Sequence, residues 1–263
     1  MTNLIWNKEN ISIIASNQDI ASITIAKQVE KLDLPVFYLE NKSFLQISDE
    51  DLPEADNYII LSRHSSAASE PAFTVHSVGN FSPDKPKLGG KAATLGKTQA
   101  EIQTYLLYSL AKNLDPQFTH FDIVAEATHH GPLVQKPVIF IEMGSSDEVW
   151  NSERAAAVIA KSIEYFLTNY ENFTRSLPVA IGFGGGHYPR KIVNTMLALE
   201  YAVGHICPKY AIDFLTPDIV SQMVRNTLAS NKVEYALFDK KGMKKKQEIK
   251  ELVTSLGLSV IEI

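Results

Sequence analysis

Short apolar runs rich in β-branched residues alternate along this chain with longer amphipathic stretches. The apolar runs predict strands at 11–15, 35–39, 58–61, 121–127, 137–143, 178–183, 201–206, 235–238 and 258–263. The amphipathic stretches predict helices at 18–31, 99–113, 152–170, 190–200, 217–229 and 244–255. Because strands alternate with helices throughout, we expect an α/β fold of three layers, α/β/α, with a mostly parallel, mixed sheet.

One segment interrupts this alternation. Residues 62–98 are rich in Ser, Pro, Gly and Lys and contain only a short apolar piece at 73–78. A loop region of that length in a compact domain usually serves a function. A chain of 263 residues can bury a substantial core. We therefore expect a single domain over 1–263 with a loop-rich insertion around 62–98.

Ionisable residues follow or end several of the predicted strands. They are His64 after 58–61, Glu126, His129 and His130 at the end of 121–127, Glu142 near the end of 137–143, and His187 after 178–183. In parallel α/β sheets, the carboxyl ends of the strands form the ligand crevice. Histidine titrates near neutrality and is the commonest metal ligand. The pattern therefore predicts that these segments face one cleft.

Three consecutive glycines, Gly184, Gly185 and Gly186, precede His187 in the motif GFGGGHYPRK. Such a run costs conformational entropy unless the backbone needs unusual torsions or a ligand approaches closely. Pro189 suits the first turn of a helix whose N–H groups would face an anion or a developing oxyanion. The alternative is a tight strand-to-helix turn without a ligand. The motif matches neither the dinucleotide-binding nor the P-loop pattern.

The residues alone do not decide between a metal-dependent and a metal-free mechanism. A cleft rich in His and Glu suits zinc, which activates water, but a neutral histidine acting as base with backbone N–H groups would serve as well. Arg63 could clamp a carboxylate or a phosphate. His76 either lines the cleft or lies on the surface, and His120 and His205 are interpreted as structural. A serine triad is disfavoured because no GxSxG motif occurs.

Composition and charge narrow the class of protein. The single cysteine, Cys207, rules out an internal disulfide, so a metal would be held by His and carboxylate ligands. The formal net charge of −5 gives no global support for a nucleic-acid partner. Local basic clusters exist at Lys85, Lys87, Lys91 and Lys97 and over 240–246. Neither a membrane helix nor a signal peptide is recognised in the sequence, which favours a cytoplasmic protein.

Five motifs taken together resemble a known family. In chain order they are SRHSS, TVHSVGN, EATHHGP, IEMGSS and GFGGGHYPRK. The sequence resembles the archaeal and plant type of D-aminoacyl-tRNA deacylase from about Leu61 to the C-terminal region. This resemblance implies a zinc-dependent hydrolase that cleaves the ester between a D-amino acid and tRNA, a chiral proofreading or detoxification reaction. It also implies a fold similar to phosphorylase/peptidyl-tRNA hydrolase-like proteins.

Carried over residue by residue, the resemblance implies a site built from His64, His129, His130, His187, Glu126 and Glu142. As a hypothesis for their roles, the metal ligands are His129, His187 and Glu142. The residues that orient groups or transfer protons are His64, His130, Glu126 and again His187. Substrate contacts are expected from Arg63, Gly184, Gly185, Gly186, Tyr188, Arg190, Lys191 and Lys91.

The resemblance also implies the partner, which is the acceptor end of D-aminoacyl-tRNA, with no DNA and no membrane, bound by a monomer. The basic clusters would contact its phosphates in a salt-dependent manner. Two alternatives lack an RNA substrate. One is a metal-dependent hydrolase or amidase of small molecules. The other is a purine-phosphorylase-like enzyme in which Arg63 and the glycine loop bind phosphate.

Overall fold

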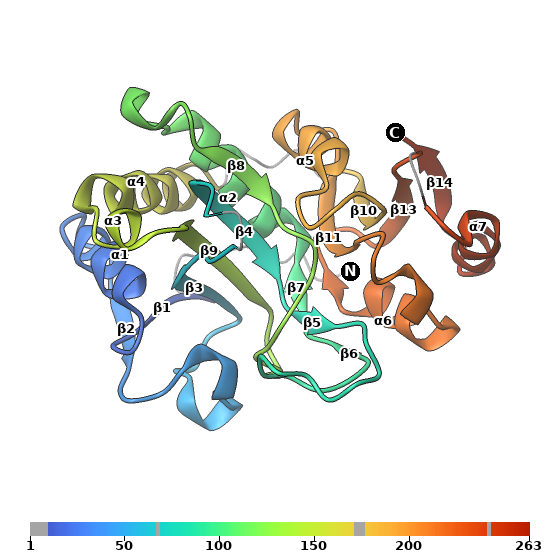
Figure 1. Cartoon of the computed structure of the whole chain (residues 1–263), viewed down its shortest axis with the longest axis horizontal. Helices are drawn as coiled ribbons and strands as arrows, with labels where there is room; N and C mark the ends of the chain where they lie inside the picture. The colour runs from blue at the N-terminus through green and yellow to red at the C-terminus, as the bar shows by residue number, and fades with distance from the viewer. Residues whose placement is uncertain (1–9, 67–68, 171–176, 241–242) are drawn as a thin grey trace.

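The computed structural model describes residues 10–66, 69–170, 177–240 and 243–263. Strands alternate with helices along the described chain (Figure 1). The longer strands are β1 (Ile11–Ser16), β2 (Val36–Leu39), β3 (Asn57–Arg63), β4 (Ala72–Ser77), β8 (Asp122–Ala125), β9 (Val138–Gly144), β10 (Val179–Phe183), β11 (Ala202–Cys207), β13 (Val233–Phe238) and β14 (Ser259–Glu262). The helices are α1 (Ile20–Glu30), α2 (Ala100–Lys112), α3 (Asp147–Trp150), α4 (Glu153–Asn169), α5 (Arg190–Leu197), α6 (Pro217–Arg225) and α7 (Lys246–Ser255). Each strand and helix predicted from the sequence is present.

The strands form two main sheets. The larger has the order β2-β1-β3-β9-β4-β8, and the smaller has the order β11-β10-β13-β14. All neighbours pair in parallel except β4 and β9, so β4 and β8 run opposite to the other four strands of the larger sheet. The expected mainly parallel α/β architecture is confirmed, with its strands divided between two sheets.

Helix α2 lies between the two sheets and unites their cores. It contacts β4 and β8 of the larger sheet and β11 of the smaller one. Ten of its thirteen residues are buried. Helices α1 and α4 cover one face of the larger sheet, and the segment around Phe44 and Ile47 covers the other. Among the residues placed, no helix is both long and apolar enough to span a membrane.

Part of the loop-rich segment 62–98 is core structure. Strand β4 is buried along its whole length between β8 and β9. It was not predicted as a strand because Thr74, His76 and Ser77 interrupt its apolar pattern. The short strands β5 (Gly79–Asn80) and β6 (Thr94–Leu95) flank an irregular loop, and β7 (Thr98–Gln99) follows β6. The loop-rich description therefore applies mainly to residues 81–93.

His205 ties strand β11 to the residues between β6 and β7 and to the segment that follows β8. It is fully buried, its Nε2 lies 3.0 Å from the Gly96 carbonyl oxygen, and its Nδ1 lies 3.2 Å from the Thr128 hydroxyl. The ring therefore donates from Nε2, and in its neutral form it accepts from the hydroxyl at Nδ1. The structural role expected for this histidine is confirmed.

Acid should weaken the fold through His205. Burial lowers its pKa from 6.5 to about 4, although the contact with Gly96 opposes the shift. The unfolded chain therefore binds this proton more readily, so the contribution of His205 is intact above pH 6.5 and declines between pH 6.5 and 4. We expect a loss of about 3 kcal/mol over that interval. Urea unfolding of wild type and His205→Gln from pH 7 to 4 tests this, because the variant should lack that part of the pH dependence. Parallel curves would contradict it.

Candidate active site

A cavity of about 520 Å³ collects most of the ionisable residues predicted from the sequence. Its polar lining includes His64, Glu126, Glu142, His129, His130 and His187. They come from the ends of β3, β8, β9 and β10, as the sequence pattern predicted. The strands that bring these residues together are not all parallel members of one sheet, however. Strand β8 runs opposite to β3 and β9, and His187 enters from the other sheet. The residues therefore meet between two sheets and not along one carboxyl edge.

The Glu126 carboxylate is the centre of this cluster. It is 1% exposed, and its Oε2 lies 2.6 Å from His187 Nε2 and 3.9 Å from His129 Nε2. Its Oε1 lies 3.0 Å from His64 Nδ1, although this atom has no well-directed hydrogen bond among the described residues. Burial raises the pKa of Glu126, but the contacts with His187 and His64 outweigh it and hold the pKa well below its usual range. Glu126 is therefore a buried anion.

His64 is a buried cation held on both sides. Burial lowers its pKa, but the neighbouring carboxylates of Glu126 and Glu142 raise it to about 10. Its Nδ1 faces both carboxylates, at 3.0 and 3.5 Å, and its Nε2 lies 2.5 Å from the Tyr188 hydroxyl. The Trp150 indole donates to the His64 carbonyl at 3.0 Å. With both ring nitrogens engaged, His64 is placed to orient the carboxylates.

His76 belongs to the same cluster, which the sequence left undecided. It is fully buried, and its Nε2 lies 3.6 Å from Glu142 Oε1. Thr74, two residues earlier on β4, donates to Glu142 Oε2 at 3.4 Å. The alternation of strand side chains puts Thr74 and His76 on one face. Recognition of 72–77 as a strand would have found this pair.

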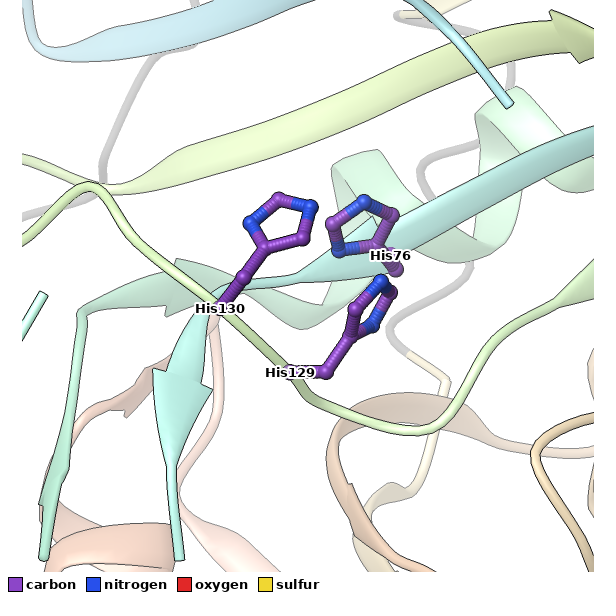
Figure 2. Close-up of side chains that lie close together, drawn as sticks. All are labelled: His76, His129 and His130. Atoms are coloured by element: carbon purple, nitrogen blue, oxygen red, sulfur yellow. The ribbon is translucent and has the colours of Figure 1, made fainter. Parts of the chain in front are cut away.

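Three imidazole rings, those of His76, His129 and His130, lie close together (Figure 2). His129 Nδ1 lies 2.8 Å from the Ala127 carbonyl oxygen, and His130 Nδ1 lies 2.5 Å from that of Gly131. A carbonyl only accepts, so each Nδ1 carries the proton and each Nε2 keeps a lone pair. Burial and the charge of His76 lower the pKa of His129 well below its usual value and that of His130 to about 4. Both rings are neutral.

The donor set suits a zinc ion. Three trios have ligand atoms within 4.8 Å of one another, namely Glu126–His129–His187, His76–His129–His130 and His64–Glu126–Glu142. Glu126 Oε1 and His76 Nε2 are buried without a hydrogen-bond partner in the described part of the chain. Neutral imidazoles with a free Nε2, fixed by carbonyls through Nδ1, are the ligands that zinc prefers in proteins. The carboxylate that accompanies His129 and His187 is Glu126, whereas Glu142 lies with His64 and His76.

The backbone conformation of the loop accounts for glycine at positions 184 and 185. Gly184 and Gly185 have φ values of 102° and 73°. A Cβ on Gly185 would lie 2.8 Å from Pro189 Cα. The Gly184 N–H donates to the carbonyl of the buried Cys207, at 2.9 Å, so it is not available to an oxyanion. For Gly184 the structure favours the alternative of a tight turn.

The predicted basic contacts divide into two groups. Arg63 lines the cavity, with its guanidinium carbon 5.7 Å from the centroid of the Trp150 ring. Lys91 is exposed on the loop beside the cavity. In contrast, Arg190 is paired with Asp122 through both carboxylate oxygens, and Lys191 with Asp239.

Most lysines of the basic cluster over 240–246 also lie near acidic side chains. Lys244 and Lys245 lie near Asp213, and Lys246 contacts Glu262. Lys241 of this cluster falls outside the described residues. Asp19, which the sequence did not single out, lines the cavity and accepts from the Ser62 hydroxyl and the Arg63 N–H, both at 3.0 Å.

A mainly parallel α/β fold with a buried cluster of histidines and glutamates facing a cavity has the features of an enzyme active site. Residues 51–261 match the family model described as D-aminoacyl-tRNA deacylase. The chain therefore belongs to the D-aminoacyl-tRNA deacylase family. The resemblance stated from the motifs is confirmed.

Two relatives agree with this assignment, and a solved structure shares the fold. The D-aminoacyl-tRNA deacylase of Methanocaldococcus jannaschii is 36% identical over 88% of this chain and 89% of its own length. That of Pyrococcus horikoshii is 38% identical over 76% of this chain and 72% of its own length. The crystal structure of AF0625, a conserved protein of unknown function, has a TM-score of 0.85 at 25% identity, covering 98% of this chain and 96% of the other.

Proposed function

We propose that this chain hydrolyses the ester bond of D-aminoacyl-tRNA in the cavity around Glu126, releasing free D-amino acid and tRNA. The observation that carries the proposal is the buried Glu126 carboxylate in contact with His64 and His187 in a chain of this family. Buried carboxylates with strongly shifted pKa values are concentrated at catalytic sites. The alternative of a small-molecule hydrolase or phosphorylase has no support from the family match.

We assign zinc to the residues nearest Glu126. His129, His187 and Glu126 would hold the ion, in place of the set with Glu142 expected from the sequence. Zinc bound by such ligands polarises an ester carbonyl and brings the pKa of water toward neutrality. The family match and the buried Glu126 Oε1, which has no hydrogen-bond partner among the described residues, support this assignment.

The other residues of the cluster have separate tasks. Cationic His64 sits between Glu126 and Glu142 and keeps both carboxylates ionised and oriented. His130 is neutral, because burial lowers its pKa to about 4, and its Nε2 lone pair is a candidate to receive a proton from water. Tyr188 fixes the far side of the His64 ring.

The acceptor end of tRNA would approach along the open side of the cavity. Arg63 lines the cavity, and Lys85, Lys87 and Lys91 are exposed on the loop whose Leu88 also lines it. Cations placed there suit the phosphates of a single-stranded RNA end. We propose that Arg190 and Lys191 contribute less, because their charges are already paired with acids. Such an enzyme would work in the cytoplasm as a monomer.

Chelation tests the zinc assignment and the reaction together. We expect the purified protein to release D-tyrosine from D-Tyr-tRNA and to leave L-Tyr-tRNA intact. Removal of metal should reduce the rate by about a hundredfold or more, and added zinc should restore it. Metal analysis of wild type and His129→Ala accompanies the assay. Full activity of the metal-free protein would overturn the zinc assignment, and hydrolysis of neither ester would overturn the function.

A further inference from the structure

Besides its histidines and glutamates, the cavity has apolar lining residues, which we call the apolar wall. This apolar wall consists of Phe44, Leu45, Leu88 and Phe140. Phe44 and Phe140 are nearly fully buried and pack edge to face, with ring centroids 5.9 Å apart. Leu45 and Leu88 are more open, and Leu88 is 54% exposed. An open leucine beside a cavity gains burial only when an apolar group enters.

The apolar wall is held in a fixed position relative to the histidines. The Phe140 ring stacks on His76 and lies edge-on to His130, at centroid distances of 4.9 and 5.1 Å. The Leu88 carbonyl accepts from the N–H of Gly131, directly after His130, at 2.9 Å. This hydrogen bond holds Leu88 next to the turn that contains His130.

Gly89, next to Leu88, lets this loop pack against the backbone of Leu45. Its φ is 70°, and a Cβ at this position would lie 2.0 Å from the Leu45 carbonyl oxygen. Only glycine lets the backbone after Leu88 lie so close to that of Leu45. Leu45 and Leu88 thus face the cavity from two segments whose backbones are in direct contact. This is the arrangement of a preformed pocket.

We propose that the apolar wall binds the side chain of the D-amino acid, so that the enzyme favours large apolar and aromatic residues over small ones. This inference rests on the proposed deacylase function. The ester must lie at the His and Glu cluster, which lines the polar part of the cavity. The apolar wall is then the part of the cavity left for the side chain. One methylene more or less in a hydrophobic pocket changes kcat/KM by about 10- to 200-fold.

Two esters on one tRNA test the inference. The same tRNA is charged with D-phenylalanine or with D-alanine, and kcat/KM is measured for wild type, Leu45→Ala and Leu88→Ala. We expect each variant to lose about tenfold on the D-phenylalanyl ester and less than about twofold on the D-alanyl ester. Leu256→Ala, an exposed leucine outside the cavity, is the matched control. Equal losses on both esters would place the leucines against the tRNA and overturn the inference, as would no loss on either.

Binding separates this inference from the proposed reaction. The probes are the stable amides 3′-(D-phenylalanylamino)-3′-deoxyadenosine and its D-alanyl counterpart, titrated calorimetrically into the zinc-loaded protein. Wild type should bind the phenylalanyl compound about tenfold more tightly, and Leu45→Ala should remove most of that difference. Equal binding by wild type would refute the pocket even in an active enzyme. A retained difference in a protein without deacylase activity would refute the reaction and keep the pocket.

Discussion

Glu126→Gln should abolish nearly all deacylase activity while leaving the protein folded. Glutamine has the shape of glutamate, but its amide carries no charge and places N–H donors where Glu126 faces donors of His64 and His187. The cation on His64 loses one of its two carboxylates. General acid–base and electrostatic effects of this kind are each worth about 10²- to 10⁴-fold. We therefore expect kcat/KM on D-Tyr-tRNA to fall by about a thousandfold.

The control for this prediction is Glu148→Gln, which removes an exposed carboxylate of helix α3. It should keep activity within about twofold, since a surface charge far from a specific contact contributes little. Urea unfolding and zinc content are measured for both variants, so a loss of fold is recognised as such. A folded Glu126→Gln protein that retains a tenth or more of wild-type kcat/KM would contradict the central role given to Glu126.

The elements were predictable because their signals are local. A helix such as α4 shows its apolar stripe within its own residues, β10 is a continuous apolar run, and β1 is largely apolar. Strand β4 was harder, because its inward-facing Thr74 and His76 serve the site and give the segment a polar composition. Division into two sheets depends on strand pairing between segments far apart in the sequence, which no local pattern contains.

The sequence predicted which residues form the site better than it predicted how they are arranged. His64, Glu126, Glu142 and His187 all follow or end apolar runs, and all of them line the cavity. The sequence could not show that β8 runs antiparallel to β9, and that reversal decides which carboxylate meets which histidine. Glu126, rather than Glu142, consequently lies with His129 and His187. Spacing along the chain carries no information about that choice.

A methyl group at position 144 should destabilise the protein severely. Gly144 ends β9, and a Cβ there would lie 1.9 Å from the carbonyl oxygen of His64. Because the obstructing atom belongs to the backbone of the neighbouring chain segment, a side-chain rotation cannot relieve the clash. The same segment is tied to β9 by the His64 N–H, which donates to the Met143 carbonyl at 2.9 Å. Gly144→Ala must therefore push β3 and β9 apart at His64.

Overpacking of this kind costs about 3 kcal/mol, which corresponds to a fall in Tm of roughly 9 °C for a chain of this size. Gly186→Ala is the matched control, because its Cβ would have no atom of the described residues within 4 Å, its chain neighbours aside, and its φ lies outside the left-handed region. Its stability should stay within about 0.5 kcal/mol of wild type. Thermal and urea unfolding of both variants measure the difference. If the two alanines had equal effects, close packing at the His64 carbonyl would not be what requires glycine at the end of β9.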